Sequence, residues 1–163
     1  MSLTLDAATP ADVPVILSMI GELAEFERLS NEVVATEASL HVALFGAQPT
    51  AMTVVARVDG EVAGFALYFV NFSTFLCRAG IYIEDLFVRP VYRGRGVGKA
   101  LLVQVARLAA ARGCGRMEWA VLNWNRRAIE FYEALGARSV DGWTVYRLDR
   151  AALEALDASG DGA

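Results

Sequence analysis

Cysteine and histidine are scarce in this 163-residue chain, which contains two cysteines and one histidine. Cys77 and Cys114 are too far apart for a C-x-x-C motif, so their spacing predicts neither a disulfide framework nor a zinc site. His41 is not adjacent to either cysteine in the sequence, which argues against a Cys/His nucleophile. We therefore expect chemistry that uses neither a metal nor a covalent cysteine intermediate.

A long apolar run and an excess of basic residues are also missing. The uncharged apolar stretch from Val62 to Cys77 falls short of the roughly 18 residues of a membrane helix and is rich in strand-forming residues. Residues 1–6 lack a basic region followed by an apolar run, so we expect a cytoplasmic protein without a membrane partner. The net charge of −4 and pI near 5.0 argue against a nucleic-acid partner and favour a cationic substrate.

A glycine-rich loop follows an apolar strand and opens directly into a helix. Glycine lets a backbone approach a ligand closely, and a helix N-terminus presents unpaired N–H groups and a positive dipole end. The loop also carries three basic side chains. These features predict a site for phosphate or pyrophosphate, and a purely structural turn is the alternative. The residues concerned are Arg93, Gly94, Arg95, Gly96, Val97, Gly98 and Lys99.

Two common phosphate motifs do not fit this loop. A Walker loop would need glycine at position 93 and serine or threonine at position 100, where this chain has Arg93 and Ala100. A dinucleotide fingerprint needs G-x-G-x-x-G, and Gly94 to Gly98 is one residue too short. The pattern that remains is Arg93-x-x-Gly96-x-Gly98.

The hydrophobic pattern predicts a single domain over residues 1–156 with a disordered tail over residues 157–163. Asp59-Gly60 is a hairpin signal, and the order strand, anion-binding helix, strand, helix in the second half indicates a parallel crossover. The expected strands are 2–8, 52–58, 61–71, 79–88, 115–122 and 143–148, and the expected helices are 13–29, 36–45, 97–112 and 125–135, with a short helical tail from residue 149.

Two adjacent carboxylates, Glu84 and Asp85, interrupt the strand 79–88, which is otherwise apolar on both faces. Burying an unpaired charge costs several kcal/mol, so these residues indicate either a function or carboxylates satisfied by neighbouring groups. Simple alternation places Tyr82, Leu86 and Val88 on the face of Glu84, and Ile81, Ile83 and Phe87 on the face of Asp85.

The last turns of the first helix are acidic. Carboxylates at a helix C-terminus are unfavourable by roughly 0.3–1 kcal/mol each. They form either an acidic rim that receives a basic substrate or a solvated face with Arg28 as partner. The acidic residues are Glu22, Glu25, Glu27 and, just beyond the helix, Glu32.

Further motifs extend the pattern to nearly the whole chain, which resembles the GNAT family of N-acetyltransferases. The resemblance rests on the loop above and on Asn123-x-Asn125-x-x-Ala128-x-x-Phe131-Tyr132-x-x-x-Gly136-Ala137. Three segments are similar to the diamine (spermidine/spermine) and thialysine branch: Leu23 to Glu27, Tyr82 to Val88, and Gly142-Trp143. The resemblance implies an α/β fold with a mixed, mostly antiparallel sheet flanked by helices, whose parallel strand pair splays around a coenzyme A site.

The resemblance also implies a direct transfer of acetyl from acetyl-CoA to a primary amine. Glu84 would act as base, through water, and Tyr132 would protonate the sulfur of coenzyme A. The implied cofactor-binding residues are Leu86, Phe87, Val88, Arg93, Gly94, Arg95, Gly96, Val97, Gly98, Lys99, Asn125 and Tyr132. The implied substrate-binding residues are Glu25, Phe26, Glu27, Glu84, Asp85 and Trp143.

The acceptor stays open at this point. Arg28, Ser30 and Asn31 make the end of the first helix less acidic than in the polyamine branch, which argues against a long polycation. A diamine, a thialysine- or lysine-like amino acid, a polyamine and a wholly different amine all stay open. A non-catalytic module that binds acetyl-CoA is the competing class. The resemblance further implies a homodimer in which the strand near Trp143 joins the partner.

Overall fold

The computed structural model describes residues 1–160. The chain divides into two compact units, Met1–Leu122 and Asn123–Ala163, and each is described by itself. The first unit contains β1 (Leu3–Ala7), α1 (Val13–Phe26), α2 (Glu37–Phe45), β2 (Met52–Val58), β3 (Glu61–Ser73), β4 (Arg78–Val88), α3 (Val97–Ala111) and β5 (Met117–Trp119), with short 3₁₀ helices η1 (Pro10–Asp12), η2 (Ser30–Glu32) and η3 (Pro90–Tyr92). The second contains α4 (Arg126–Ala134) and α5 (Arg150–Gly160).

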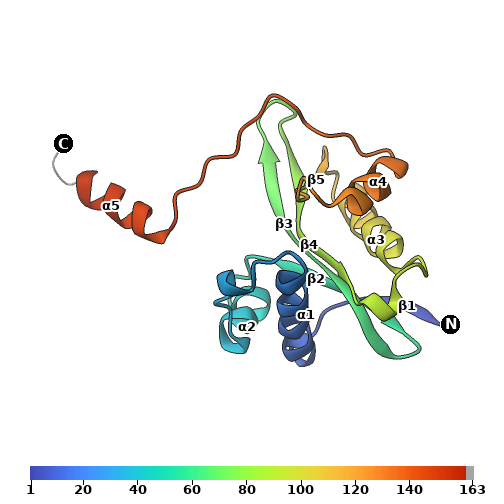
Figure 1. The fold of residues 1–163 in the computed structure, drawn as a ribbon. Coiled ribbons are helices and arrows are strands. Elements are labelled where there is room, and N and C mark those ends of the chain that lie inside the picture. The colour runs from blue at the N-terminus through green and yellow to red at the C-terminus, as the bar shows by residue number, and fades with distance from the viewer. Residues whose placement is uncertain (161–163) are drawn as a thin grey trace. The chain divides into compact units, whose positions relative to one another are not determined.

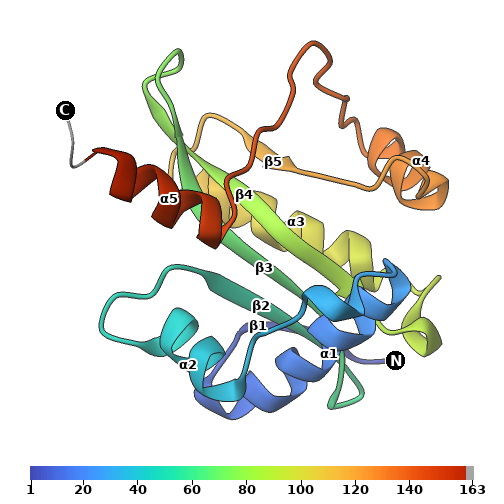
Figure 2. The same cartoon turned by 60° about the vertical axis from the view of Figure 1, so that its left-hand side comes forward.

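The first unit is built on one mixed sheet with the strand order β1-β2-β3-β4-β5. The first four strands pair antiparallel, and β5 pairs parallel to β4. Helices α1 and α2 cover one face of the sheet and α3 covers the other, as Figures 1 and 2 show. This architecture confirms the predicted fold class.

Two apolar layers hold the sheet between its helices. On one side, Ile16 and Met19 of α1 are fully buried against Phe65 and Phe87 of the sheet. On the other side, α3 buries a stripe that includes Leu101. Each such buried side chain stabilises the fold by roughly 1.5–3 kcal/mol. The apolar residues at helical spacing therefore hold each helix in one position on the sheet.

Most of the predicted elements are confirmed, and their ends follow the expected local chemistry. The Asp59-Gly60 hairpin joins β2 to β3. Helix α2 starts with a capping box between Thr36 and Ser39. The first helix ends at Phe26 rather than at residue 29, because Arg28 adopts a positive φ of 61° and breaks the helical path.

Two strands differ from the prediction. The strand predicted over residues 115–122 is confined to Met117–Trp119. The strand predicted over residues 143–148 is wrong, because a strand needs a neighbour for its backbone groups and these residues pair with none in the described chain. Helix α5 includes residues 157–160 of the predicted tail, and the remaining three lie outside the described residues. Within residues 1–160, no helix combines the length and apolar character that a membrane crossing needs.

Candidate active site

A β-bulge lies where β4 carries its two carboxylates. Leu67 of β3 pairs with Asp85, but the next residue, Tyr68, pairs with Ile83. Glu84 is therefore an extra residue without a direct partner on β3. Bulges of this kind re-aim side chains and are frequent beside active sites.

The bulge changes which side chains share a face of β4. Residues directly opposite each other on paired strands share a face. Asp85 thus lies on the α1 face with Leu67, and so does Tyr82, which is opposite Phe69 with ring centroids 5.2 Å apart. The predicted alternation is wrong here: Tyr82 does not share a face with Leu86, because the prediction assumed a regular strand through Glu84.

The carboxyl group of Asp85 is the most perturbed acid in this region. Burial, followed by the neighbouring charges of Glu84 and Glu27, raises the pKa of Asp85 from 3.8 to about 6. Burial also raises the pKa of Glu27. The structure therefore brings three predicted substrate-binding carboxylates, two from β4 and one from the end of α1, into one electrostatically coupled cluster.

The other acidic residues of the first helix do not join this cluster in the same way. Glu22 forms an ion pair with Arg89, whose Nη2 lies 2.8 Å from Glu22 Oε1, and so fastens α1 to the end of β4. Glu25 and Glu32 are exposed. Among Glu22, Glu25, Glu27 and Glu32, it is Glu27 whose charge acts on Asp85.

The parallel strand pair is short and opens beside this cluster. β5 pairs with β4 only from Ile81 to Ile83. From Glu84 to Val88, the edge of β4 that would face β5 has no strand partner in the first unit. An open strand edge offers backbone N–H and C=O groups to an extended ligand.

The glycine-rich loop lies directly beyond this open edge. Gly94 and Gly96 adopt positive φ angles of 75° and 81°, and a Cβ at either position would meet nothing within 4 Å. Gly96 caps α3, where the Ala100 N–H donates to the Gly96 carbonyl. The N–H groups of the first turn have no partner inside the helix, which is the geometry of an anion site.

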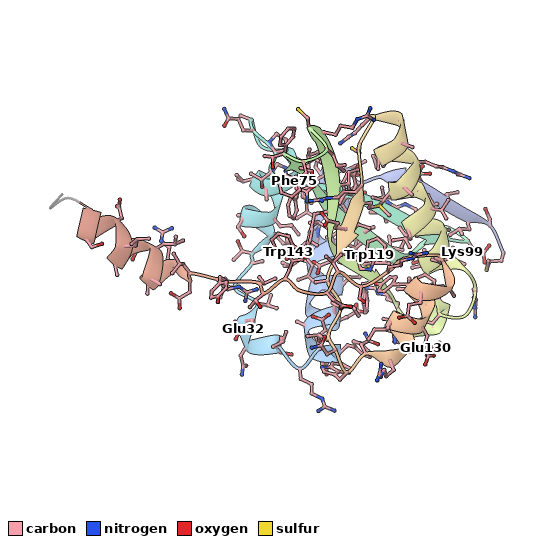
Figure 3. The ribbon with its side chains drawn as sticks, turned by 90° about the horizontal axis from the view of Figure 1, so that it is seen from above. Glu32, Phe75, Lys99, Trp119, Glu130 and Trp143 are labelled. Carbon is pink, nitrogen blue, oxygen red and sulfur yellow. The ribbon has the colours of Figure 1, made fainter. Side chains whose placement is uncertain are left out.

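The basic side chains of the loop take different places. Arg93 Nε donates to the Val88 carbonyl over 2.8 Å, and its guanidinium lies over the rings of Phe26 and Phe87. Arg93 thus joins the ends of β4 and α1. Arg95 lies over the Tyr92 ring, and Lys99 is exposed on the first turn of α3 (Figure 3).

Three predicted site residues belong to the second unit. The Asn125 side chain accepts a hydrogen bond from Ala128 N–H over 3.3 Å and caps α4. Tyr132 is half-buried on α4 beside Phe131, and Trp143 is 79% exposed in the irregular segment that follows. The assigned roles of Asn125, Tyr132 and Trp143 stay predictions.

Sequence reasoning missed a polar group on the same face of the sheet. Glu118 of β5 lies opposite Tyr82, and together with Glu84 it raises the pKa of the Tyr82 hydroxyl, for which burial is the largest cause. Arg116 and Asn71 contact Glu118. The alternation Arg116-x-Glu118 was visible in the sequence, but the register that places it beside Tyr82 was not.

Carboxylates at the open end of a parallel strand pair, followed by a glycine-rich helix start, are the arrangement that the sequence motifs predicted for an α/β N-acetyltransferase. Among residues 1–160, no group of three or more His, Cys, Asp or Glu side chains is placed to hold a metal ion. The family model described as acetyltransferase (GNAT) family matches residues 20–137. The chain belongs to this family, as its motifs predicted.

Curated relatives and a solved structure agree with this assignment. The chain is 39% identical to a thialysine N-ε-acetyltransferase of Bos taurus, with 91% of this chain and 94% of that protein covered. It is 38% identical to an L-ornithine N5-acetyltransferase of Arabidopsis thaliana, with 92% and 86% covered. An integron cassette protein from the mobile metagenome of V. cholerae shares the fold with a TM-score of 0.80 and 25% identity, with 96% and 98% covered. The chain is accordingly an N-acetyltransferase of the predicted branch.

Proposed function

We propose that this enzyme transfers an acetyl group from acetyl-CoA to a primary amine of a small basic substrate, which is a diamine, a polyamine or a lysine-like amino acid. The observation that carries the proposal is the coupled cluster of Glu84, Asp85 and Glu27 at the bulge, on the strand that leads into the glycine-rich loop. The cluster is suited to attract an ammonium group. The loop is suited to hold a phosphate-bearing partner.

The residues of the first unit fit coenzyme A. The open space beside Gly94 and Gly96 and the first turn of α3 would receive the pyrophosphate. The open edge of β4 at Phe87 and Val88 would hold the pantetheine arm and the thioester carbonyl. When bound, acetyl-CoA supplies an activated thioester. The protein supplies orientation and proton transfer.

The chemistry requires two protons to leave the substrate ammonium, one before attack and one as the amide forms, and one proton to reach sulfur. Glu84, through water, takes a proton from the substrate ammonium, so that the neutral nitrogen can attack the acetyl carbonyl. The new C–N bond forms and the C–S bond breaks, which releases coenzyme A as a thiolate. Tyr132 gives this sulfur its proton, and the second proton, which leaves nitrogen as the amide forms, returns through solvent to the Tyr132 oxygen. The products are the N-acetylated amine and free coenzyme A.

The relatives support a substrate with a terminal amine on a short chain. Their names specify thialysine and L-ornithine, and each of these carries a distal primary amine in addition to its α-amino group. A distal ammonium has the charge that the acidic cluster can bind. A neutral acceptor would gain nothing from three coupled carboxylates.

Release of free thiol from acetyl-CoA tests the proposal against a panel of amines. We expect L-ornithine, L-lysine, thialysine or 1,4-diaminobutane to accelerate release, and a neutral alcohol of the same length to have no effect. If acetyl-CoA binds and no amine accelerates thiol release, the chain is a binding module and the proposed transfer is wrong.

The homodimer is part of the same proposal. Residues 143–148 form no strand in the isolated chain, and Val145 and Tyr146 are 89% and 91% exposed, which suits a segment that pairs with a partner. Sedimentation velocity at micromolar concentration checks this point, and a monomer would remove the dimer from the proposal.

A further inference from the structure

A side chain of β3 reaches across β4 to hold a carboxylate on β5. Asn71 is opposite Gly80 in the register, and its Nδ2 donates to Glu118 Oε2 over 3.3 Å. A Cβ at Gly80 would collide with Asn71 Oδ1. The missing side chain at Gly80 is therefore what lets Asn71 cross the middle strand and fix Glu118.

Glu118 also has a cation beside it. Arg116 Nε lies 2.9 Å from Glu118 Oε2, and the two side chains are 46% and 33% exposed. The ion pair and the Asn71 hydrogen bond both use Oε2 of Glu118, and the ion pair uses Nε of Arg116. Within residues 1–160, Oε1 of Glu118 and both Nη groups of Arg116 take part in no hydrogen bond. The carboxylate of Glu118 thus keeps one acceptor oxygen available to a ligand, and the guanidinium of Arg116 keeps its two Nη donor groups.

The pair lies on the face of the sheet that carries the acidic cluster. Glu118 is opposite Tyr82, two residues along β4 from Glu84. With strands about 4.8 Å apart and a rise of about 3.3 Å per residue, the Cα atoms of Glu118 and Glu84 are roughly 8 Å apart. A side chain of ornithine or lysine length can bridge two groups at this separation.

We propose that Arg116 and Glu118 form the site that binds the head group of an α-amino acid substrate, with Arg116 Nη donating to the α-carboxylate and Glu118 Oε1 accepting from the α-ammonium. The distal amine of the same substrate then lies at Glu84 and Asp85. This inference rests on the proposed acetyl transfer and selects the amino acid over the diamine. Glu118 alone would serve either substrate, because both carry a second ammonium group. Arg116 serves only the amino acid and repels a diamine.

A matched pair of substrates isolates the role of Arg116. L-Ornithine and 1,4-diaminobutane differ only in the carboxylate, so the ratio of their kcat/KM values reports its recognition. We expect the wild type to favour L-ornithine. Arg116→Gln should lower kcat/KM for L-ornithine roughly tenfold, as for loss of a charge-assisted hydrogen bond at a half-exposed site, and should leave 1,4-diaminobutane unchanged or improved.

The role of Glu118 has its own substrate comparison. Glu118→Gln should weaken both L-ornithine and 1,4-diaminobutane, and should have little effect on Nα-acetyl-L-ornithine, whose α-nitrogen carries no charge. Arg107→Gln, an exposed change on α3, and Glu61→Gln, an exposed change at the start of β3, are the matched controls. Neither control should alter the ratio.

Asn71 is a positioning residue that acts through Glu118, so it is tested by the Glu118 comparison. Asn71→Ala and Gly80→Ala should both weaken L-ornithine and 1,4-diaminobutane, while Nα-acetyl-L-ornithine and the KM for acetyl-CoA stay constant. A purely structural role would lower the values for Nα-acetyl-L-ornithine as well.

The outcomes separate this inference from the proposed function. If amines are acetylated but Arg116→Gln changes both substrates equally or neither, or if the wild type prefers 1,4-diaminobutane, the head-group site is wrong and the transfer stands. If no amine is acetylated, calorimetric titration with L-ornithine decides. Weaker binding by Arg116→Gln than by Arg107→Gln supports the site, and equal binding overturns it.

Discussion

Replacing Asp85 by asparagine should make the protein more stable and less active. The pKa of this carboxyl is raised from 3.8 to about 6 by burial and by the charges of Glu84 and Glu27. Between pH 3.8 and about pH 6, the Asp85 carboxyl of the folded chain therefore holds a proton that the same group in the unfolded chain has lost. The free energy of unfolding therefore falls as the pH rises through this window, and the full penalty is present above it.

The magnitude follows from the size of the shift. A shift of about two units corresponds to about 3 kcal/mol, because each pKa unit is worth about 1.4 kcal/mol. An asparagine side chain has a similar shape to that of aspartate and carries no charge. Asp85→Asn should thus raise the free energy of unfolding by about 3 kcal/mol at pH 8, and by close to nothing at about pH 4, where the folded wild type keeps this carboxyl protonated and the penalty is absent.

Urea denaturation of both proteins at the two pH values measures this difference. Asp141→Asn removes an exposed carboxylate in the second unit and serves as the control, with no change expected. At pH 8 the Asp85 variant should also show a lower kcat/KM for basic amines, because it lacks a charge that attracts them. Equal stability of the variant and the wild type at pH 8, or a gain that persists unchanged at pH 4, would refute the reasoning.

Four further substitutions test the remaining parts of the site. Gly96→Val should raise the KM for acetyl-CoA, because φ is 81° at Gly96 and valine is strained there. Gly98→Ala should raise it less, since its Cβ would make an ordinary 3.6 Å contact with Val88. Titration with coenzyme A checks both variants, and affinities equal to that of the wild type would contradict the proposed anion site. Glu27→Gln should raise the KM for basic amines more than for acetyl-CoA, and added salt should also raise the KM for basic amines. A variant that matches the wild type with every amine would show that Glu27 is a solvated surface residue and does not bind the substrate. Tyr132→Phe should lower kcat by roughly 10²–10⁴-fold with little effect on KM, and unchanged single-turnover rates would exclude Tyr132 as the acid.

The sequence predicted most elements of the first unit because their signals are local. Helix α3 combines an apolar stripe with glycines at both ends, and Asp59-Gly60 is a strong local signal for a hairpin turn. The glycine-rich loop at the start of α3 was predictable for the same reason, since glycine spacing and a helix start are adjacent in the chain. The family model and the relatives confirm the assignment that these motifs supported.

The face of each side chain on β4 was not predictable, because it depends on pairing with another strand. Glu84 becomes a bulge only in the register that joins Leu67 to Asp85 and Tyr68 to Ile83. No residue type within the strand marks that register. The limited extent of β5 and the crossing of Asn71 over Gly80 are likewise properties of the assembled sheet.

The bulge determines which side chains β4 presents to the two proposed ligands. In a regular strand Tyr82, Leu86 and Val88 would share one face, and Asp85 would point away from Tyr82. The extra residue instead gathers Tyr82 and Asp85 on the α1 face, where Glu27 and Glu118 add negative charge. The strand then continues to Val88, whose side chain would touch a Cβ at Gly98 in α3 and whose carbonyl holds Arg93. The proposed amine-binding groups and the glycine-rich loop are thus attached to the same few residues of β4, and a single insertion relative to β3 fixes both the charge of the proposed acceptor site and its distance from the proposed cofactor site.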